Sequence, residues 1–202
     1  MPGRTPQAAS MRSASAHQYV MGAFRGFTLV ELVVVILIIG ILSALALPRF
    51  ANVNDFNLRE FNDQALSVVR YGQKIAIAQN LSVFVRLNGT SVALCYDAAC
   101  ASPVPAPNNA NSGSSATLAA CGNSTSWECE GAPSGVSFTA SNGTTSYIGS
   151  SPAFFFSPQG KPYNSGESEP NSTFVKTMTV TTSGAAGSFT FTVEPETGYV
   201  HH

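Results

Sequence analysis

The feature of this sequence that most constrains its fold is an apolar run near the start. Residues 27–47 read FTLVELVVVILIIGILSALAL, which is 21 residues with a single charged side chain, Glu31. A helix needs about 20 such residues to span the hydrocarbon core of a bilayer, so the run predicts a transmembrane helix. A secretory signal peptide would have an apolar stretch of about 7–15 residues followed directly by a small-residue cleavage site. The sequence meets neither condition.

The distribution of charge predicts how this helix is oriented. Only 10% of the residues are charged, against about 25% in an average soluble domain. All the acidic residues lie at or after Glu31, whereas residues 1–26 contain three arginines and no acid. Because Lys and Arg are retained on the cytoplasmic side of a membrane, we expect residues 1–26 inside the cell and the chain beyond Pro48 outside the membrane.

Glu31 argues against an ordinary single-pass anchor, because a carboxylate in lipid costs about 3 kcal/mol. The segment RGFTLVE, which ends at Glu31 and is followed by the apolar run and Pro48, resembles the class III signal of type IV pilins and type II secretion pseudopilins. The resemblance implies that a prepilin peptidase cleaves between Gly26 and Phe27 and that Phe27 is N-methylated. Residues 1–26 would then be the leader peptide. Because Met21 alone can begin an adequate six-residue leader, residues 1–20 are interpreted as a mis-assigned start rather than a functional arm.

The same resemblance makes Glu31 the fifth residue of the mature chain. The new α-amine on Phe27 is a cation, and Glu31 of one subunit can pair with the amine of a neighbour during assembly, which neutralises a costly buried charge. The alternative is that Glu31 reaches back to the lipid headgroups. Gly26 fits a peptidase pocket that tolerates little bulk, or it is a flexible joint. Pro48 is tolerated in a transmembrane helix and predicts a kink.

The pattern of residues 48–80 predicts an amphipathic helix, which continues the transmembrane helix expected at residues 27–47. Apolar residues recur every three or four positions, as at Leu58, Phe61 and Ala65, which is one face of a helix. Asn80 is the expected stop.

Residues 81–202 predict an antiparallel β-sheet domain, so the fold class is α+β. Asn88-Gly89 between two apolar runs is a strong hairpin signal for residues 82–96. The resemblance implies the type IV pilin fold. The segments FSPQG (156–160) and FTVEPETGYV (191–200) are similar to H-type pseudopilins and FimT-like minor pilins. Residues 64–79 resemble a minor pilin of the mannose-sensitive haemagglutinin (MSHA) system. Further strands are expected at 136–139, 153–156, 174–182, 188–193 and 198–200.

Four cysteines lie in the part expected outside the membrane, where disulfides persist. Three pairings are possible, and Cys95–Cys100 with Cys121–Cys129 is the most local. That pairing would staple the ends of a long loop, residues 97–135, which is uncharged from Ala98 to Trp127. The loop is either a tolerated insertion or a display surface with Trp127 as an exposed anchor, although a lone Trp more often packs in a core. The absence of C-x-x-C spacing argues against a metal site.

The sequence offers little for catalysis, and we expect neither an enzyme nor a cofactor. Its histidines are His17, His201 and His202, and no nucleophile, base and orienting group can be proposed together. Beyond residue 26 there are seven basic and eleven acidic residues, so a nucleic-acid partner is not expected.

These observations favour a minor pilin or pseudopilin that is built into a type IV pilus, MSHA-like, or a type II secretion pseudopilus, in an initiation or tip complex. Its expected partners are the prepilin peptidase, other pilins or pseudopilins, the inner-membrane assembly platform and the membrane itself. Its expected location is the bacterial inner membrane, with the N-terminus cytoplasmic and the C-terminal domain periplasmic, and then the filament. The alternative is a tip adhesin that binds a ligand, with DNA uptake less favoured.

Overall fold

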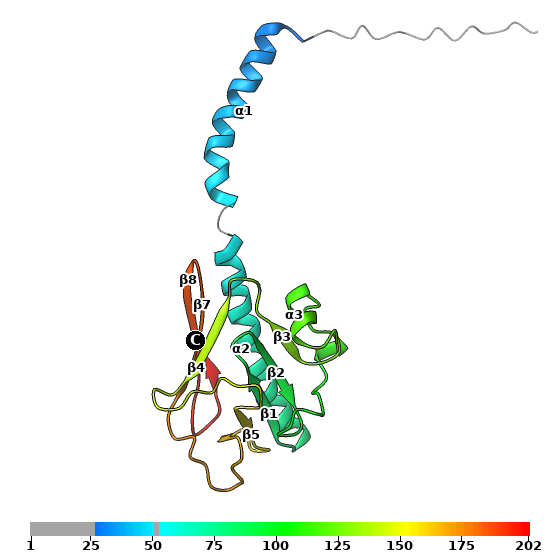
Figure 1. Cartoon of the computed structure of the whole chain (residues 1–202), viewed down its shortest axis with the longest axis vertical. Helices are drawn as coiled ribbons and strands as arrows, with labels where there is room; N and C mark the ends of the chain where they lie inside the picture. Colours follow the sequence, from blue (N-terminus) through cyan, green and yellow to red (C-terminus); the bar gives the residue numbers. More distant parts are fainter. Residues whose placement is uncertain (1–26, 51–52) are drawn as a thin grey trace, which may run out of the picture. The chain divides into compact units, whose positions relative to one another are not determined.

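The computed structural model describes residues 27–50 and 53–202, and it describes side chains for residues 27–43 and 55–202. The chain divides into two compact units between Leu45 and Ala46, inside helix α1 (Leu29–Phe50). The second unit contains helix α2 (Val53–Gln79) and all the strands (Figure 1). Residues 51–52 are not described, so the prediction of one helix over residues 27–80 lies partly outside the described residues.

Helix α1 exposes an apolar surface along its described length. Every described side chain from Phe27 to Ser43 is exposed, and Leu29 is 79% exposed. In the part of the chain that the structure describes, no helix has both the length and the hydropathy of a membrane crossing. The backbone of Pro48 is helical, but its side chain is not described, so the predicted kink stays a prediction.

Helix α2 is amphipathic, as the spacing of its apolar residues predicts. Leu58, Phe61 and Ala65 are all buried. The helix ends where Asn80 adopts a positive φ of 54°, and the amide of Leu81 donates to the carbonyl of Ala76 over 3.2 Å. This is the Schellman arrangement, in which a left-handed residue satisfies the last helical carbonyls. The predicted stop at Asn80 is confirmed.

The strands form two antiparallel sheets. The first has the order β3-β2-β1-β5-β6 and the second β4-β7-β8-β9. The predicted hairpin is β1–β2, and its turn is held by the Asn88 side chain, which accepts from the amides of Thr90 and Ser91. The short strands β3 and β6 were not predicted. The bounds are β1 (Val83–Leu87), β2 (Ser91–Cys95), β3 (Cys129–Gly131), β4 (Ser137–Ser141), β5 (Phe154–Phe156), β6 (Pro162–Asn164), β7 (Met178–Gly184), β8 (Gly187–Val193) and β9 (Val200–His201).

The core of the second unit lies between α2 and both sheets. Phe61 of α2 packs against Phe138 of β4 with ring centroids 5.8 Å apart. A buried hydrogen bond also joins α2 to the centre of the second sheet, because Thr182 donates to the Asn62 side chain over 3.0 Å. A helix packed on antiparallel strands confirms the predicted α+β class.

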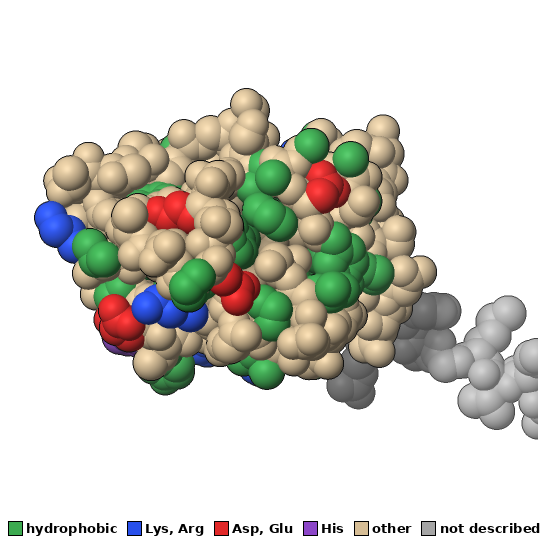
Figure 2. Space-filling model, turned by 90° about the horizontal axis from the view of Figure 1, so that it is seen from below, with side chains coloured by type: hydrophobic (Ala, Val, Ile, Leu, Met, Phe, Trp, Pro, Cys, Tyr) green, Lys and Arg blue, Asp and Glu red, His purple; other side chains and the backbone are tan. Residues whose placement is uncertain are grey.

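The surface of the second unit carries few charges. Figure 2 shows a few acidic and basic side chains scattered among hydrophobic and other side chains on the face that it displays. One exposed pair is Lys161–Glu196, with its nitrogen and oxygen 2.9 Å apart, and exposed pairs of this kind contribute little to stability.

Two turns that are far apart in sequence meet on Gln73 of α2. The Gln73 amide nitrogen donates to the carbonyl of Gly160 over 3.1 Å and to that of Thr197 over 2.7 Å. A Cβ on Gly198 would lie 2.1 Å from the Gly160 carbonyl oxygen, and Gly198 has a φ of +66°. Both the conformation and the close approach therefore require glycine at position 198.

We predict that Gly198→Ala lowers the free energy of unfolding by about 3 kcal/mol or more, because the left-handed conformation alone costs an L-residue about 1–2 kcal/mol and the clash adds to it. Chemical denaturation of the full chain in detergent measures the loss. Gly113→Ala is the matched control, since Gly113 has a φ of +64° and a Cβ added there would meet no atom within 4 Å. Equal losses in the two variants would contradict the packing argument.

Candidate functional site

The first turn of α1 is an N-terminal cap built from the predicted signal. Thr28 precedes the helix, and its hydroxyl accepts from the amide of Glu31 over 3.2 Å. The order Thr-x-x-Glu is that of a capping box, in which the cap satisfies an amide that has no helical partner. Glu31 also lies in the first turn, where a negative charge interacts favourably with the helix dipole.

The cap binds the backbone amide of Glu31 and leaves its carboxylate without a hydrogen bond to the cap. Within the described residues, no hydrogen bond or ion pair involves the Glu31 side-chain oxygens, and the residue is exposed. Phe27 is 75% exposed, and Gly26 lies outside the described residues. Sequence reasoning assigned Glu31 to assembly and missed the capping role, although the Thr-x-x-Glu spacing before an apolar run is a readable signal.

The segment predicted as a long loop contains regular structure. Residues 97–135 include a 3-10 turn η1 (Pro107–Asn109), helix α3 (Ser115–Ala120) and strand β3. Cys95 is bonded to Cys100 and Cys121 to Cys129, which is the most local of the three pairings. The segment is therefore a folded subdomain on the edge of the first sheet, because β3 pairs with β2.

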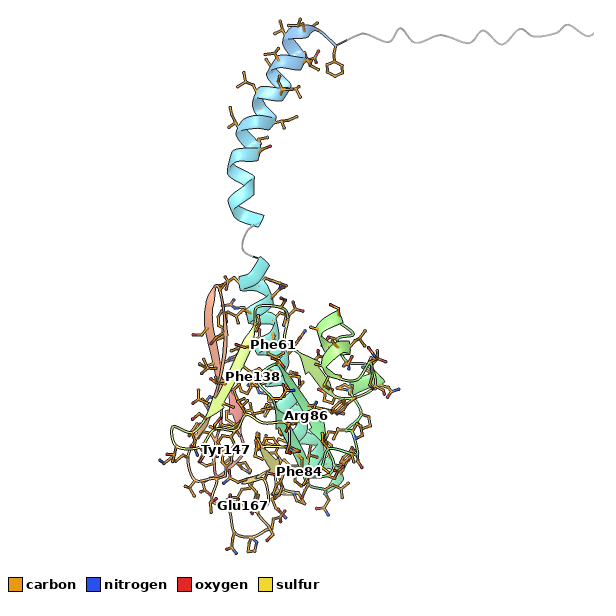
Figure 3. The ribbon with its side chains drawn as sticks, in the orientation of Figure 1. Phe61, Phe84, Arg86, Phe138, Tyr147 and Glu167 are labelled. Carbon is orange, nitrogen blue, oxygen red and sulfur yellow. A yellow bond between two sulfur atoms is a disulfide. The ribbon has the colours of Figure 1, made fainter. Side chains whose placement is uncertain are left out.

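Trp127 lies in this segment as a packing group. Its indole nitrogen donates to the carbonyl of Leu94 over 2.7 Å, and the Arg86 guanidinium lies 4.9 Å from the ring centroid. The residue is half-buried beside the Cys121–Cys129 disulfide. Arg86 projects from β1 (Figure 3), and its desolvation lowers its pKa. Trp127 is consequently committed to contacts within the chain, which weakens the idea of an exposed aromatic anchor.

Two buried carboxylates, Glu128 and Glu130, flank Cys129 at the start of β3. Glu130 accepts from the amide and hydroxyl of Ser112 and from the hydroxyl of Thr117. Glu128 is 7% exposed, and no hydrogen bond to its side chain is present among the described residues. Burial, with a smaller contribution from the charge of Glu130, raises the pKa of Glu128 to about 7. Glu130 therefore fixes the α3 segment, and Glu128 is an acid whose ionisation the fold opposes.

The terminal histidines have partners within the domain. His201 contacts the carboxylate of Glu194 over 3.0 Å, and that hydrogen bond raises the pKa of His201. His202 lies 3.4 Å from a carboxylate oxygen of Asp63 on α2. Among the described residues, no group of three or more His, Cys, Asp or Glu side chains could hold a metal ion.

One family match lies near the start of the chain. Residues 21–47 match the family described as the prokaryotic N-terminal methylation motif. Over 55 residues the chain is 46% identical to the type IV narrow pilus major component PilA5 of Thermus thermophilus. The aligned residues make up 27% of this chain and 47% of PilA5. This chain therefore carries the methylation motif and is similar over part of its length to type IV pilins. Over 57 residues it is also 46% identical to the type IV major fimbrial protein FimA of Dichelobacter nodosus, covering 28% of this chain and 33% of FimA.

This pilin-like chain therefore spans less than half the length of the curated relatives it matches. Two solved structures are similar to it. The minor pilin FimU of Pseudomonas aeruginosa has a TM-score of 0.44 at 8% identity, over 71% of this chain and 86% of FimU. The minor pseudopilin EpsH of the Vibrio cholerae type 2 secretion system has a TM-score of 0.46 at 10% identity, over 72% of this chain and 94% of EpsH.

We predict that Glu128 makes the pilin-like chain less stable as pH rises. Its pKa is about 7 in the folded state and near 4.5 when unfolded, so the folded state binds a proton that the unfolded chain releases. The free energy of unfolding should then fall between about pH 4.5 and pH 8. Glu128→Gln removes this dependence and should raise Tm at pH 8 by about 5 °C, with a smaller effect at pH 5.

Thermal unfolding of the full chain in detergent at pH 5 and pH 8 measures this difference. Glu60→Gln, at an exposed position on α2, controls for the loss of one negative charge. If Glu128→Gln and the parent chain show the same change in Tm between the two pH values, Glu128 is not the titrating group.

Proposed function

We propose that this chain is a minor pilin or pseudopilin, processed at Gly26–Phe27 and assembled through α1 into a type IV pilus or a type II secretion pseudopilus. The observation that carries the proposal is the pairing of the methylation motif with an apolar helix whose described side chains are all exposed. Such a helix surface must be covered by lipid or by other apolar helices. A membrane would cover the helix with lipid, and a filament would then cover it with the apolar helices of other subunits.

Membrane insertion in this proposal rests on the whole apolar run of residues 27–47, which continues past the described side chains. The bias of basic residues supports an orientation with the N-terminus in the cytoplasm and the β-sheet domain in the periplasm. The proposed partners are the prepilin peptidase, the inner-membrane assembly platform and other pilins or pseudopilins. The minor role follows the resemblance of the chain's C-terminal segments to H-type pseudopilins and FimT-like minor pilins.

Processing is the first step that can be tested. Cleavage after Gly26 and methylation of the new amine would produce a mature chain that begins with N-methyl-Phe27. We expect intact-mass spectrometry of the chain co-expressed with a prepilin peptidase to show loss of residues 1–26 and the addition of one methyl group. Gly26→Val should abolish the mass change, because the residue before the cleaved bond would no longer be small. A leader still removed in Gly26→Val would contradict the assigned site.

Assembly is the second step. The cap at Thr28 leaves the Glu31 carboxylate exposed at the helix start, where it can pair with the amine of a neighbouring subunit. An ion pair formed in apolar surroundings satisfies two charges that would each be costly alone. The hydrogen bond from the Glu31 amide does not need the side chain, so replacing the carboxylate keeps the cap.

We therefore expect Glu31→Val to leave the chain processed and in the membrane fraction while reducing its incorporation into filaments at least tenfold. Immunoblotting of sheared filaments against membrane fractions measures the ratio. Glu60→Val, which removes an exposed carboxylate from α2, is the control and should assemble normally. Normal incorporation of Glu31→Val would show that the carboxylate has no assembly role.

A further inference from the structure

The outer face of the second sheet is covered by hydroxyl side chains. Alternate residues of β4, β7 and β8 are buried or, at Phe189, partly buried against the core, so the intervening residues project from the opposite side. Figure 1 shows the three strands side by side. We define the hydroxyl face as the nine outward residues of these strands: Ser137, Thr139, Ser141, Thr179, Thr181, Ser183, Ser188, Thr190 and Thr192.

Strand register places these hydroxyls in three rows. The central row is Thr139, Thr181 and Thr190, which face one another across β4, β7 and β8. A row of serines and a row of Ser141, Thr179 and Thr192 flank it. Neighbouring strands lie about 4.8 Å apart, and like-facing residues on one strand repeat about every 6.7 Å. The hydroxyl face is therefore a regular array.

Most of these hydroxyls have no partner inside the protein. Among the described residues, no hydrogen bond involves the side chains of Thr139, Thr181 or Thr190. Each hydroxyl can donate one hydrogen bond and accept two. The central row thus offers donors and acceptors at fixed spacing on stiff β-branched side chains.

The hydroxyl face is also uncharged. Beyond the last row, the Glu194 carboxylate is paired with the Thr177 hydroxyl and with His201, which lies in β9 opposite Thr192. Beside His201, the Tyr199 ring is 57% exposed and stacks on the imidazole with centroids 5.0 Å apart. A soluble surface ordinarily has about 25–35% charged residues, so nine neighbouring positions without one leave a surface suited to an uncharged partner.

We propose that the hydroxyl face, with Tyr199 at its border, is a docking surface for an extended neutral polysaccharide. Charge complementarity carries the choice of partner. A neutral sugar chain brings no ion that would need a counter-charge, and its hydroxyl groups match the array both as donors and as acceptors. A polyanion or an acidic protein would lose its water at this surface, and none of the nine hydroxyl residues would supply a cation. Tyr199 adds an exposed aromatic ring against which the apolar face of a sugar can pack. This inference goes beyond filament assembly and does not require it.

Adsorption of the full chain in detergent to microcrystalline cellulose, an uncharged glucan, tests the proposal. We expect saturable adsorption that is weakened about tenfold by Thr181→Val/Thr190→Val, because two hydrogen-bonding groups are lost while the β-branched shape is kept. Tyr199→Leu should weaken it separately. Thr125→Val, which removes an exposed threonine hydroxyl outside the hydroxyl face, should adsorb like the parent chain.

Circular dichroism and thermal unfolding establish that each variant is folded, and Tyr199→Leu serves as the test if the double variant is not. The proposal is overturned if the parent chain does not adsorb, or if the folded variants adsorb as it does. Stronger adsorption to sulfated cellulose than to the neutral polymer would overturn the charge argument. Sedimentation of each variant measures self-association and so tests whether the face binds a second copy of the chain. If the variants lose self-association in parallel with adsorption, the face binds a second copy instead of a polysaccharide.

Discussion

Both sheets of the second unit pack on one helix, and the rest of the unit depends on that contact. Leu58, Phe61 and Val69 of α2 are buried in the same cluster as Val85 of the first sheet and Val180 of the second. A hydrogen bond accepted by Asn62 and one donated by Gln73 then fix where the strands and turns lie along the helix. The buried apolar side chains of α2 supply most of the driving force for folding. The few polar contacts determine how the strands and turns align along the helix.

The two unusual carboxylates of the chain show how environment changes the role of one chemical group. Glu31 is exposed at a capped helix start, where the helix dipole favours its charge. Glu128 is buried next to Glu130, and its surroundings favour the protonated form. In the function we propose, Glu31 is free to find a partner in another subunit, whereas Glu128 belongs to the internal structure of the subdomain around α3.

Sequence patterns were sufficient where a strong local signal coincided with burial. The spacing of apolar residues in α2, the Asn80 stop and the Asn88-Gly89 hairpin each combine a conformational preference with a buried face. The subdomain at residues 97–135 was not predicted, because its folding depends on long-range contacts such as β3 with β2 and on a buried carboxylate that binds Ser112 and Thr117. β6 begins with a proline and has three residues, so its pattern is too short to identify. Trp127 and the hydroxyl face required tertiary information, since their surroundings are formed by other strands.

The contacts of α2 also determine when the domain can fold. Asn62 is bound by a residue 120 positions further along the chain, and Arg70 donates to the carbonyl of Val200, 130 positions away. A helix that emerges early must therefore keep its apolar face unsatisfied until β7, β8 and β9 have been made. If the chain is exported, its core can be completed only after translocation has reached these strands. The hydrogen bond from Arg70 to Val200 can thus form only after almost the whole domain has been made.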